Sequence, residues 1–227
     1  MIGWQFGSVL PLGRAVRGLL VGDWSVAVVC EPPHGGAEPV SGEAVRLAED
    51  LVAELLAVAP GDVRVAALAP SGRPVARVAG REEATFVSVS HGRGLIGAAA
   101  SVTGRVGIDI VDPADAGRGL DSFFSPDELA LAPDDLGLLR ALLWAGKEAA
   151  YKAAGLDAEF RPRRVTIESL EANGFTWAVR DRHVAVHGAG RFAAAGRHVV
   201  AIAATAPALP REATVSRGPC EEAVACS

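Results

Sequence analysis

The stretch Val106-Gly107-Ile108-Asp109-Ile110-Val111 is a run of β-branched residues broken by one glycine and one aspartate, and it predicts a short strand. The order of expected elements starts again at this strand. Before it, the sequence predicts a helix over 41–59 and strands at 24–30, 63–68, 86–90 and 95–102. After it, the sequence predicts helices within 125–154 and strands at 164–170, 175–180, 184–187 and 198–205. This repeated order indicates an α+β fold of two similar halves.

Local signals support the expected helix ends. Ser125-Pro126-Asp127-Glu128 combines an N-cap serine, a proline at the first helical position and a glutamate at the third. Gly155 is typical of a helix C-terminus. The segment Ser71-Gly72-Arg73-Pro74 predicts a turn. We expect an N-terminal half over 1–103, a C-terminal half over 104–205 and, from its Pro, Ala and Glu content, a disordered tail over 206–227.

The composition limits the class of protein. The chain has 227 residues, half of them hydrophobic, and a net charge of −5, which fits a soluble protein with a core and no nucleic-acid partner. No apolar run approaches the ~20 residues that span a bilayer, so we expect no membrane partner. Cys30, Cys220 and Cys226 have no metal spacing and indicate reduced thiols in the cytoplasm. The alternative is a disulfide between Cys220 and Cys226.

Asp109 is the first candidate functional residue. An unpaired carboxylate inside an apolar strand is costly to bury, and a metal ion or another cation usually offsets that cost. The alternative is an aspartate that faces water or caps a turn at the open end of the strand. Glu128 is ambiguous in a similar way, since it is the capping-box glutamate as well as a candidate carboxylate for the site.

The segment Trp144-Ala145-Gly146-Lys147-Glu148-Ala149-Ala150-Tyr151-Lys152 concentrates charge on an otherwise apolar helix. Trp144, Glu148 and Lys152 lie four residues apart and form one ridge. Of the 22 Lys and Arg residues, only Lys147 and Lys152 are lysines. A compact ammonium suits a phosphate, and a carboxylate between two lysines stays ionised. The alternative is a Glu–Lys pair on a solvated helix face.

Together these segments supply carboxylates for a hard cation such as Mg²⁺ and lysines for phosphate oxygens. A carboxylate can also accept the proton of an attacking hydroxyl. This combination predicts chemistry on a pyrophosphate.

The same motifs resemble the signature of the 4′-phosphopantetheinyl transferase superfamily. They are Gly107-Ile108-Asp109, then Phe124 with Glu128, then Trp144-x-x-Lys147-Glu148-Ala149-x-x-Lys152. Gly72-Arg73-Pro74 and Ser88-Val89-Ser90-His91 resemble the larger, surfactin-synthetase-activating type. The resemblance covers roughly residues 70–155 and implies two pseudo-symmetric α+β halves with the active site between them.

The resemblance also implies roles for individual residues. Mg²⁺ would lie on Asp109 and Glu148, with Glu128 in or near the metal shell. Glu148 would also be the candidate base. Coenzyme A would be the co-substrate. The residues expected to face its phosphates are Lys147, Lys152, Arg73 and His91, with Ser90 near them. We expect a monomer that modifies a serine of an apo acyl or peptidyl carrier protein.

Two departures from the family pattern leave an alternative open. Larger members have a second metal-binding glutamate where this chain has Val111, and Asp112 should face the opposite side of the strand unless a bulge intervenes. The arginine-rich stretch for the CoA 3′-phosphate is not recognisable, and Arg14, Arg17 and Arg46 are the available substitutes. The alternative is a weak or inactive member that binds CoA or a carrier protein.

Overall fold

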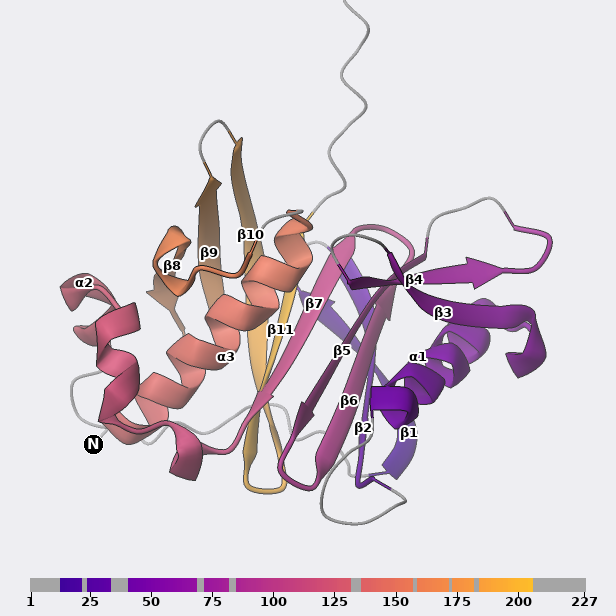
Figure 1. Ribbon diagram of the computed structural model, residues 1–227, viewed down its shortest axis with the longest axis horizontal. Helices are drawn as coiled ribbons and strands as arrows, with labels where there is room; N and C mark the ends of the chain where they lie inside the picture. The colour runs from indigo at the N-terminus through magenta and orange to yellow at the C-terminus, as the bar shows by residue number, and fades with distance from the viewer. Residues whose placement is uncertain are drawn as a thin grey trace, which may run out of the picture.

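The computed structural model describes residues 13–21, 24–33, 41–68, 72–81, 85–131, 136–156, 159–171, 173–181 and 184–205. It contains two antiparallel sheets and a few helices, which confirms the predicted α+β fold with two halves (Figure 1). The predicted tail over 206–227 lies outside the described residues, and the assignment of 1–103 and 104–205 to separate domains stays a prediction.

The first sheet has the strand order β1-β2-β6-β5-β4-β3. Its strands are β1 (Gly13–Val21), β2 (Trp24–Glu31), β3 (Val63–Leu68), β4 (Arg73–Val78), β5 (Thr85–Gly92) and β6 (Leu95–Ser101). Helix α1 (Ser41–Leu56) packs on one face of this sheet, and the short 3₁₀ helix η1 (Pro60–Asp62) leads into β3.

The second sheet has the order β7-β11-β10-β9-β8. Its strands are β7 (Arg105–Val111), β8 (Val165–Leu170), β9 (Gly174–Asp181), β10 (Val184–Ala195) and β11 (His198–Thr205). The helices of this half are α2 (Pro126–Leu129) and α3 (Leu136–Ala154), with 3₁₀ helices η2 (Pro113–Asp115), η3 (Arg118–Phe123) and η4 (Pro162–Arg164). No helix in the described part of the chain is long and apolar enough to cross a membrane.

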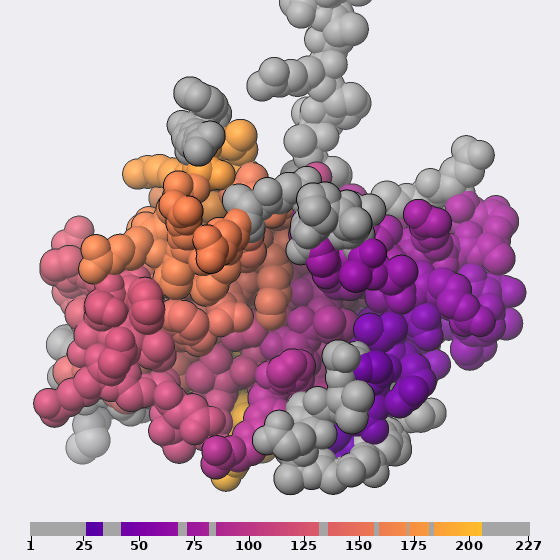
Figure 2. Space-filling model, viewed as in Figure 1, coloured from indigo at the N-terminus to yellow at the C-terminus, as the bar shows by residue number. Residues whose placement is uncertain are grey.

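Strand alternation sorts the side chains into three cores. One core lies between α1 and the first sheet, and Val29 and Leu51 belong to it. A second core joins the two sheets through residues such as Val28 and Ile108. A third lies between α3 and the second sheet, and Trp177 is its largest fully buried side chain. In the space-filling view the two halves lie directly against each other (Figure 2).

Gly107 permits the close contact between β7 and α3. A Cβ atom at this position would lie 2.0 Å from the carbonyl oxygen of Ala149 on the helix. A glycine inside a strand often marks such a close backbone approach. The contact brings the middle of β7 directly under the part of α3 that contains the charged residues.

The structure differs from the sequence-based expectation in three strands. Arg73 and Pro74 begin β4 rather than belonging to a turn, and β1 was not predicted. Strand β10 continues to Ala195, well beyond the predicted end at His187. Glycines disfavour a strand, but here they are needed, because a Cβ at Gly188 or Gly190 would collide with the ring of Trp177 or Phe175.

Candidate functional site

Asp109 lies in the middle of β7, on the face that is turned toward α3. Its neighbours Ile108 and Ile110 point into the core between the two sheets, as strand alternation requires. The Asp109 carboxylate is buried and accepts two hydrogen bonds at Oδ1. Ser90 Oγ donates one over 2.9 Å, and Lys152 Nζ donates the other, also over 2.9 Å. A residue from each half of the protein therefore holds this carboxylate.

β7 is an edge strand, and side chains bind its outer backbone groups. The N–H of Ile108 donates to Ser88 Oγ over 3.1 Å, and that of Ile110 donates to Ser90 Oγ over 3.2 Å. Lys152 Nζ donates to the carbonyl oxygen of Ile108 over 2.8 Å. A sheet edge without such partners would leave buried polar groups unsatisfied. The serines of β5 therefore join the first sheet to the second at the position of Asp109.

Glu148 precedes Lys152 by one turn of α3 and is close to the Asp109 carboxylate. The pKa of Glu148 is raised from its ordinary value of 4.5 to about 7, and burial is the largest cause. The negative charge of Asp109 and a hydrogen bond between the two carboxyl groups also raise this pKa, while Lys152 and the Trp144 side chain lower it. Near neutral pH, this pair of acids can hold either a proton or a cation.

A cleft of about 450 Å³ leads to Lys152 from the side of the first sheet. β4 and β5 pair only at Val75 with Phe86 and at Ala76 with Thr85. Just before these pairs, β4 contains Pro74, which has no N–H to donate to a neighbouring strand. The walls of the cleft are largely apolar, and its cationic lining residues are Arg73, Arg105 and Lys152. An apolar slot with three cations suits a nucleotide with several phosphates.

Comparison with known protein families agrees with this geometry. Residues 105–203 match the model of the 4′-phosphopantetheinyl transferase superfamily. The matched segment begins with β7 and ends within β11, so it contains Asp109, Glu148 and Lys152. No curated protein matches the chain. The family match supports a phosphopantetheinyl transferase role for this segment.

The carboxylates of Asp109 and Glu148 are close enough together to suit a divalent cation. Mg²⁺ binds through one or two carboxylates and keeps several waters. No cluster of three or more His, Cys, Asp or Glu residues suited to a metal occurs within the described ranges. A cation between Asp109 and Glu148 would have these two carboxylates and would take its other ligands from water.

Val111 and Asp112 take different positions at the end of β7. The pairing of β7 with β11 runs residue by residue from Arg105 to Val111. Val111 packs against the same core as α3, on the side of Asp109. The carboxylate of Asp112 accepts from the N–H of Ala114 over 3.0 Å and pairs with Arg197 over 2.9 Å. Asp112 therefore caps η2 rather than joining Asp109.

Glu128 and Lys147 meet each other in a different place. Their carboxylate and ammonium form an ion pair of 2.7 Å, and both side chains are buried. Glu128 is also the capping-box residue that the sequence predicts, since it accepts from the N–H of Ser125 over 2.8 Å. The contacts of these two residues support a structural role. The metal role of Glu128 and the phosphate role of Lys147 stay predictions that this geometry does not favour.

The remaining predicted phosphate ligands lie in different parts of the structure. Arg73 lines the cleft, whereas Ser90 is occupied with Asp109. His91 is exposed near the end of β5 and is not among the residues that line the cleft. Arg46 is exposed on α1. Arg14 and Arg17 lie in β1, where no side chain is described.

Sequence reasoning missed two contributors to the site. Arg105 donates to the carbonyl oxygen of Ala154 over 3.1 Å, at the C-terminal end of α3, and also lines the cleft. Ser88 binds the edge of β7. Nothing in the local pattern around either residue indicates these contacts, because both partners are more than 15 residues away along the chain.

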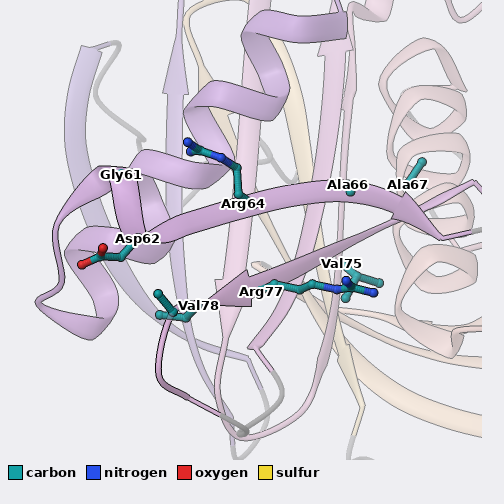
Figure 3. A pocket seen from close by; sticks show the side chains of 9 residues that line it. Gly61, Asp62, Arg64, Ala66, Ala67, Val75, Arg77 and Val78 are labelled. Carbon is teal, nitrogen blue, oxygen red and sulfur yellow. The ribbon is translucent and has the colours of Figure 1, made fainter.

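A hollow of about 570 Å³ on the outer face of the β3–β4 hairpin lies apart from the carboxylates (Figure 3). Arg64 and Arg77 are opposite each other in the strand register and both line it, together with Asp62. It shares Val75 with the cleft but, unlike the cleft, it is not lined by Lys152. Because Lys152 contacts Asp109, the cleft and not this hollow adjoins the carboxylates.

Proposed function

We propose that this protein transfers the 4′-phosphopantetheine group of coenzyme A to a serine of an apo acyl or peptidyl carrier protein and releases adenosine 3′,5′-bisphosphate. The observation on which this rests is the grouping of Asp109, Glu148 and Lys152 beside a cationic cleft, within a segment that matches the superfamily. We also propose that the protein acts as a cytoplasmic monomer.

The cleft would hold coenzyme A. The largely apolar walls between β4 and β5 offer a surface for the adenine ring, and Phe86 and Val87 belong to them. Arg73, Arg105 and Lys152 would bind its phosphates as charge-assisted donors. This arrangement puts the pyrophosphate at the end of the cleft where Lys152 contacts Asp109.

Asp109 and Glu148 would hold Mg²⁺. When bound, the ion offsets the negative charge of the pyrophosphate, as divalent cations do in other phosphoryl transfers. Ser90 keeps the Asp109 carboxylate oriented toward α3 through its hydroxyl.

Glu148 is the candidate base for the carrier-protein serine. A carboxylate positioned beside an attacking hydroxyl can take up its proton. In the transfer, the serine oxygen forms a bond to the β-phosphorus of coenzyme A, and the bond from that phosphorus to the bridging oxygen breaks. The serine proton goes to a Glu148 oxygen, and the departing phosphate takes the bond's electron pair near the ammonium of Lys152.

A second candidate is a protein that binds CoA or a carrier protein without transfer. Val111, in the position where a third carboxylate would face Asp109, is the observation that favours it. Incubation with CoA, MgCl₂ and a panel of apo carrier proteins, analysed by intact mass, separates the two. A phosphopantetheine adduct that is absent with Asp109→Ala supports the transferase. CoA binding by calorimetry without an adduct on any carrier protein would favour the second candidate.

A further inference from the structure

The ion pair between Lys147 and Glu128 is the most deeply buried one among the described residues. The lysine side chain is 1% exposed and the glutamate side chain 3%. Burial lowers the pKa of Lys147, and its hydrogen bond to Glu128 and the attraction of that carboxylate oppose the effect. A buried ion pair of this kind adds little stability over well-packed apolar residues of the same volume. Stability alone therefore does not explain the presence of Lys147 and Glu128.

Every hydrogen-bonding group of this pair is used within the protein. Besides Glu128, the Lys147 ammonium donates to the carbonyl oxygen of Pro162 over 3.2 Å and to that of Val165. Glu128 Oε1 also accepts from the N–H of Ile167 over 2.9 Å. With the capping of Ser125, the pair ties α2, α3, η4 and β8 together at one point.

This point lies at one edge of the second sheet, and the candidate site lies at the other. β8 and β7 are the two edge strands, and α3 lies across the sheet between them. Lys147 binds the β8 edge, while Lys152 binds the β7 edge and Glu148 adjoins Asp109 there. Successive residues of a helix are about 100° apart around its axis. Fixing Lys147 at β8 therefore fixes the direction in which Glu148 points.

We propose that Lys147 and Glu128 are positioning residues that set the rotation of α3 about its axis and thereby aim Glu148 at Asp109. This proposal rests on the proposed transferase function for its kinetic part. A rotation that moves the Glu148 carboxylate by about 1 Å would be enough to lower turnover by roughly 100-fold. Neither residue needs to touch CoA, the carrier protein or the metal.

The test removes both charges at once, because a single change would leave one buried charge unpaired and could unfold the protein. Glu128→Gln with Lys147→Met keeps the side-chain volumes and leaves an amide oxygen for the N–H of Ile167. The matched control is Asp121→Asn with Arg140→Met, which removes the more exposed ion pair between α3 and η3. Thermal unfolding identifies any variant that fails to fold.

We expect the Glu128→Gln/Lys147→Met protein to lose tenfold or more in kcat, and the control to match the wild type. Two-dimensional NMR of the indole N–H of Trp144, whose side chain contacts Glu148, reports the helix rotation without any need for activity. Its signal should move in the first variant and not in the control.

An unmoved indole signal in the folded first variant would overturn the proposal, whatever its kcat. So would a shift of the same size in the control, or an unchanged kcat. If the wild type modifies no carrier protein, the proposed function fails, and the indole signal alone then decides whether the pair positions Glu148.

Discussion

Ser90 and Asp109 form a hydrogen bond across the junction of the two sheets, over 2.9 Å between Ser90 Oγ and Asp109 Oδ1. The same hydroxyl accepts from the N–H of Ile110 over 3.2 Å. The Ser90 side chain thus accepts a hydrogen bond from the backbone of the β7 edge and also orients Asp109, a candidate metal ligand. The contact makes the first half of the protein a structural part of a site whose acids all belong to the second half.

Replacing Ser90 should affect both the stability of the fold and the Mg²⁺ requirement of the activity. Ser90→Ala leaves the buried N–H of Ile110 without its partner, so we expect a loss of about 1–3 kcal/mol in the free energy of unfolding. Activity should fall as well, with a higher Mg²⁺ requirement, because Asp109 is less well oriented. Ser88→Ala is the matched control: it removes the bond to Ile108 but none to a carboxylate. Equal Mg²⁺ requirements in the two variants, measured in activity titrations, would contradict this.

Lys152 occupies a place suited to a compact ammonium. Its Nζ donates to Asp109 Oδ1 over 2.9 Å and to the carbonyl oxygen of Ile108 over 2.8 Å. A planar guanidinium cannot make both contacts from the same position. We expect Lys152→Arg to lower kcat/KM by a factor of roughly 10²–10³, although the charge is conserved. Arg140→Lys, an equally conservative change at the partly buried pair with Asp121, should leave the kinetics unchanged. Wild-type kinetics for Lys152→Arg would mean that Lys152 only forms an ordinary ion pair with Asp109.

Val111 faces the same side of β7 as Asp109, so a carboxylate at 111 should project toward the same cation. Val111→Glu should lower the Mg²⁺ concentration that half-saturates activity, because a charged oxygen replaces a water. Turnover need not rise with it. Asp112→Ala should weaken the cap of η2 and the pair with Arg197 without changing that Mg²⁺ concentration. A half-saturating concentration that is unchanged or higher in Val111→Glu would mean that position 111 does not face the metal.

The raised pKa of Glu148 should make the stability of the metal-free protein depend on pH. Burial and Asp109 raise this pKa to about 7 in the fold, against an ordinary value of 4.5. The folded state then binds the proton more tightly than the unfolded state, so this contribution to stability is complete below about pH 4.5 and is lost as pH rises toward 7. In urea unfolding, the wild type should lose stability relative to Glu148→Gln across that window.

Mg²⁺ provides the control for that measurement. Added at pH 8, where Glu148 is mostly ionised, it should stabilise the wild type more than Glu148→Gln, because it binds two carboxylates in the wild type and only one in the variant. Stability curves of the two proteins that stay parallel from pH 4.5 to 8 would show that Glu148 titrates normally in the fold.

The sequence by itself determined the elements around the site. β-branched residues predict β7. The capping box at Ser125 and the glycine at 155 mark the start and the end of the helical region, as the structure confirms. Helical periodicity also placed Glu148 and Lys152 on one ridge, and both are near Asp109. These predictions succeeded because they depend on contacts within a few residues along the chain.

Only the tertiary structure decided which partner each charge has. Lys147 and Lys152 are alike in sequence, yet one binds Glu128 at β8 and the other binds Asp109 at β7. Periodicity tells which side of α3 a residue occupies, but the strand on that side depends on how the helix lies across the sheet. The contact of Ser90 with Asp109 depends in the same way on the packing of one half against the other. Such contacts join residues far apart in the chain, and the packing of the cores brings them together.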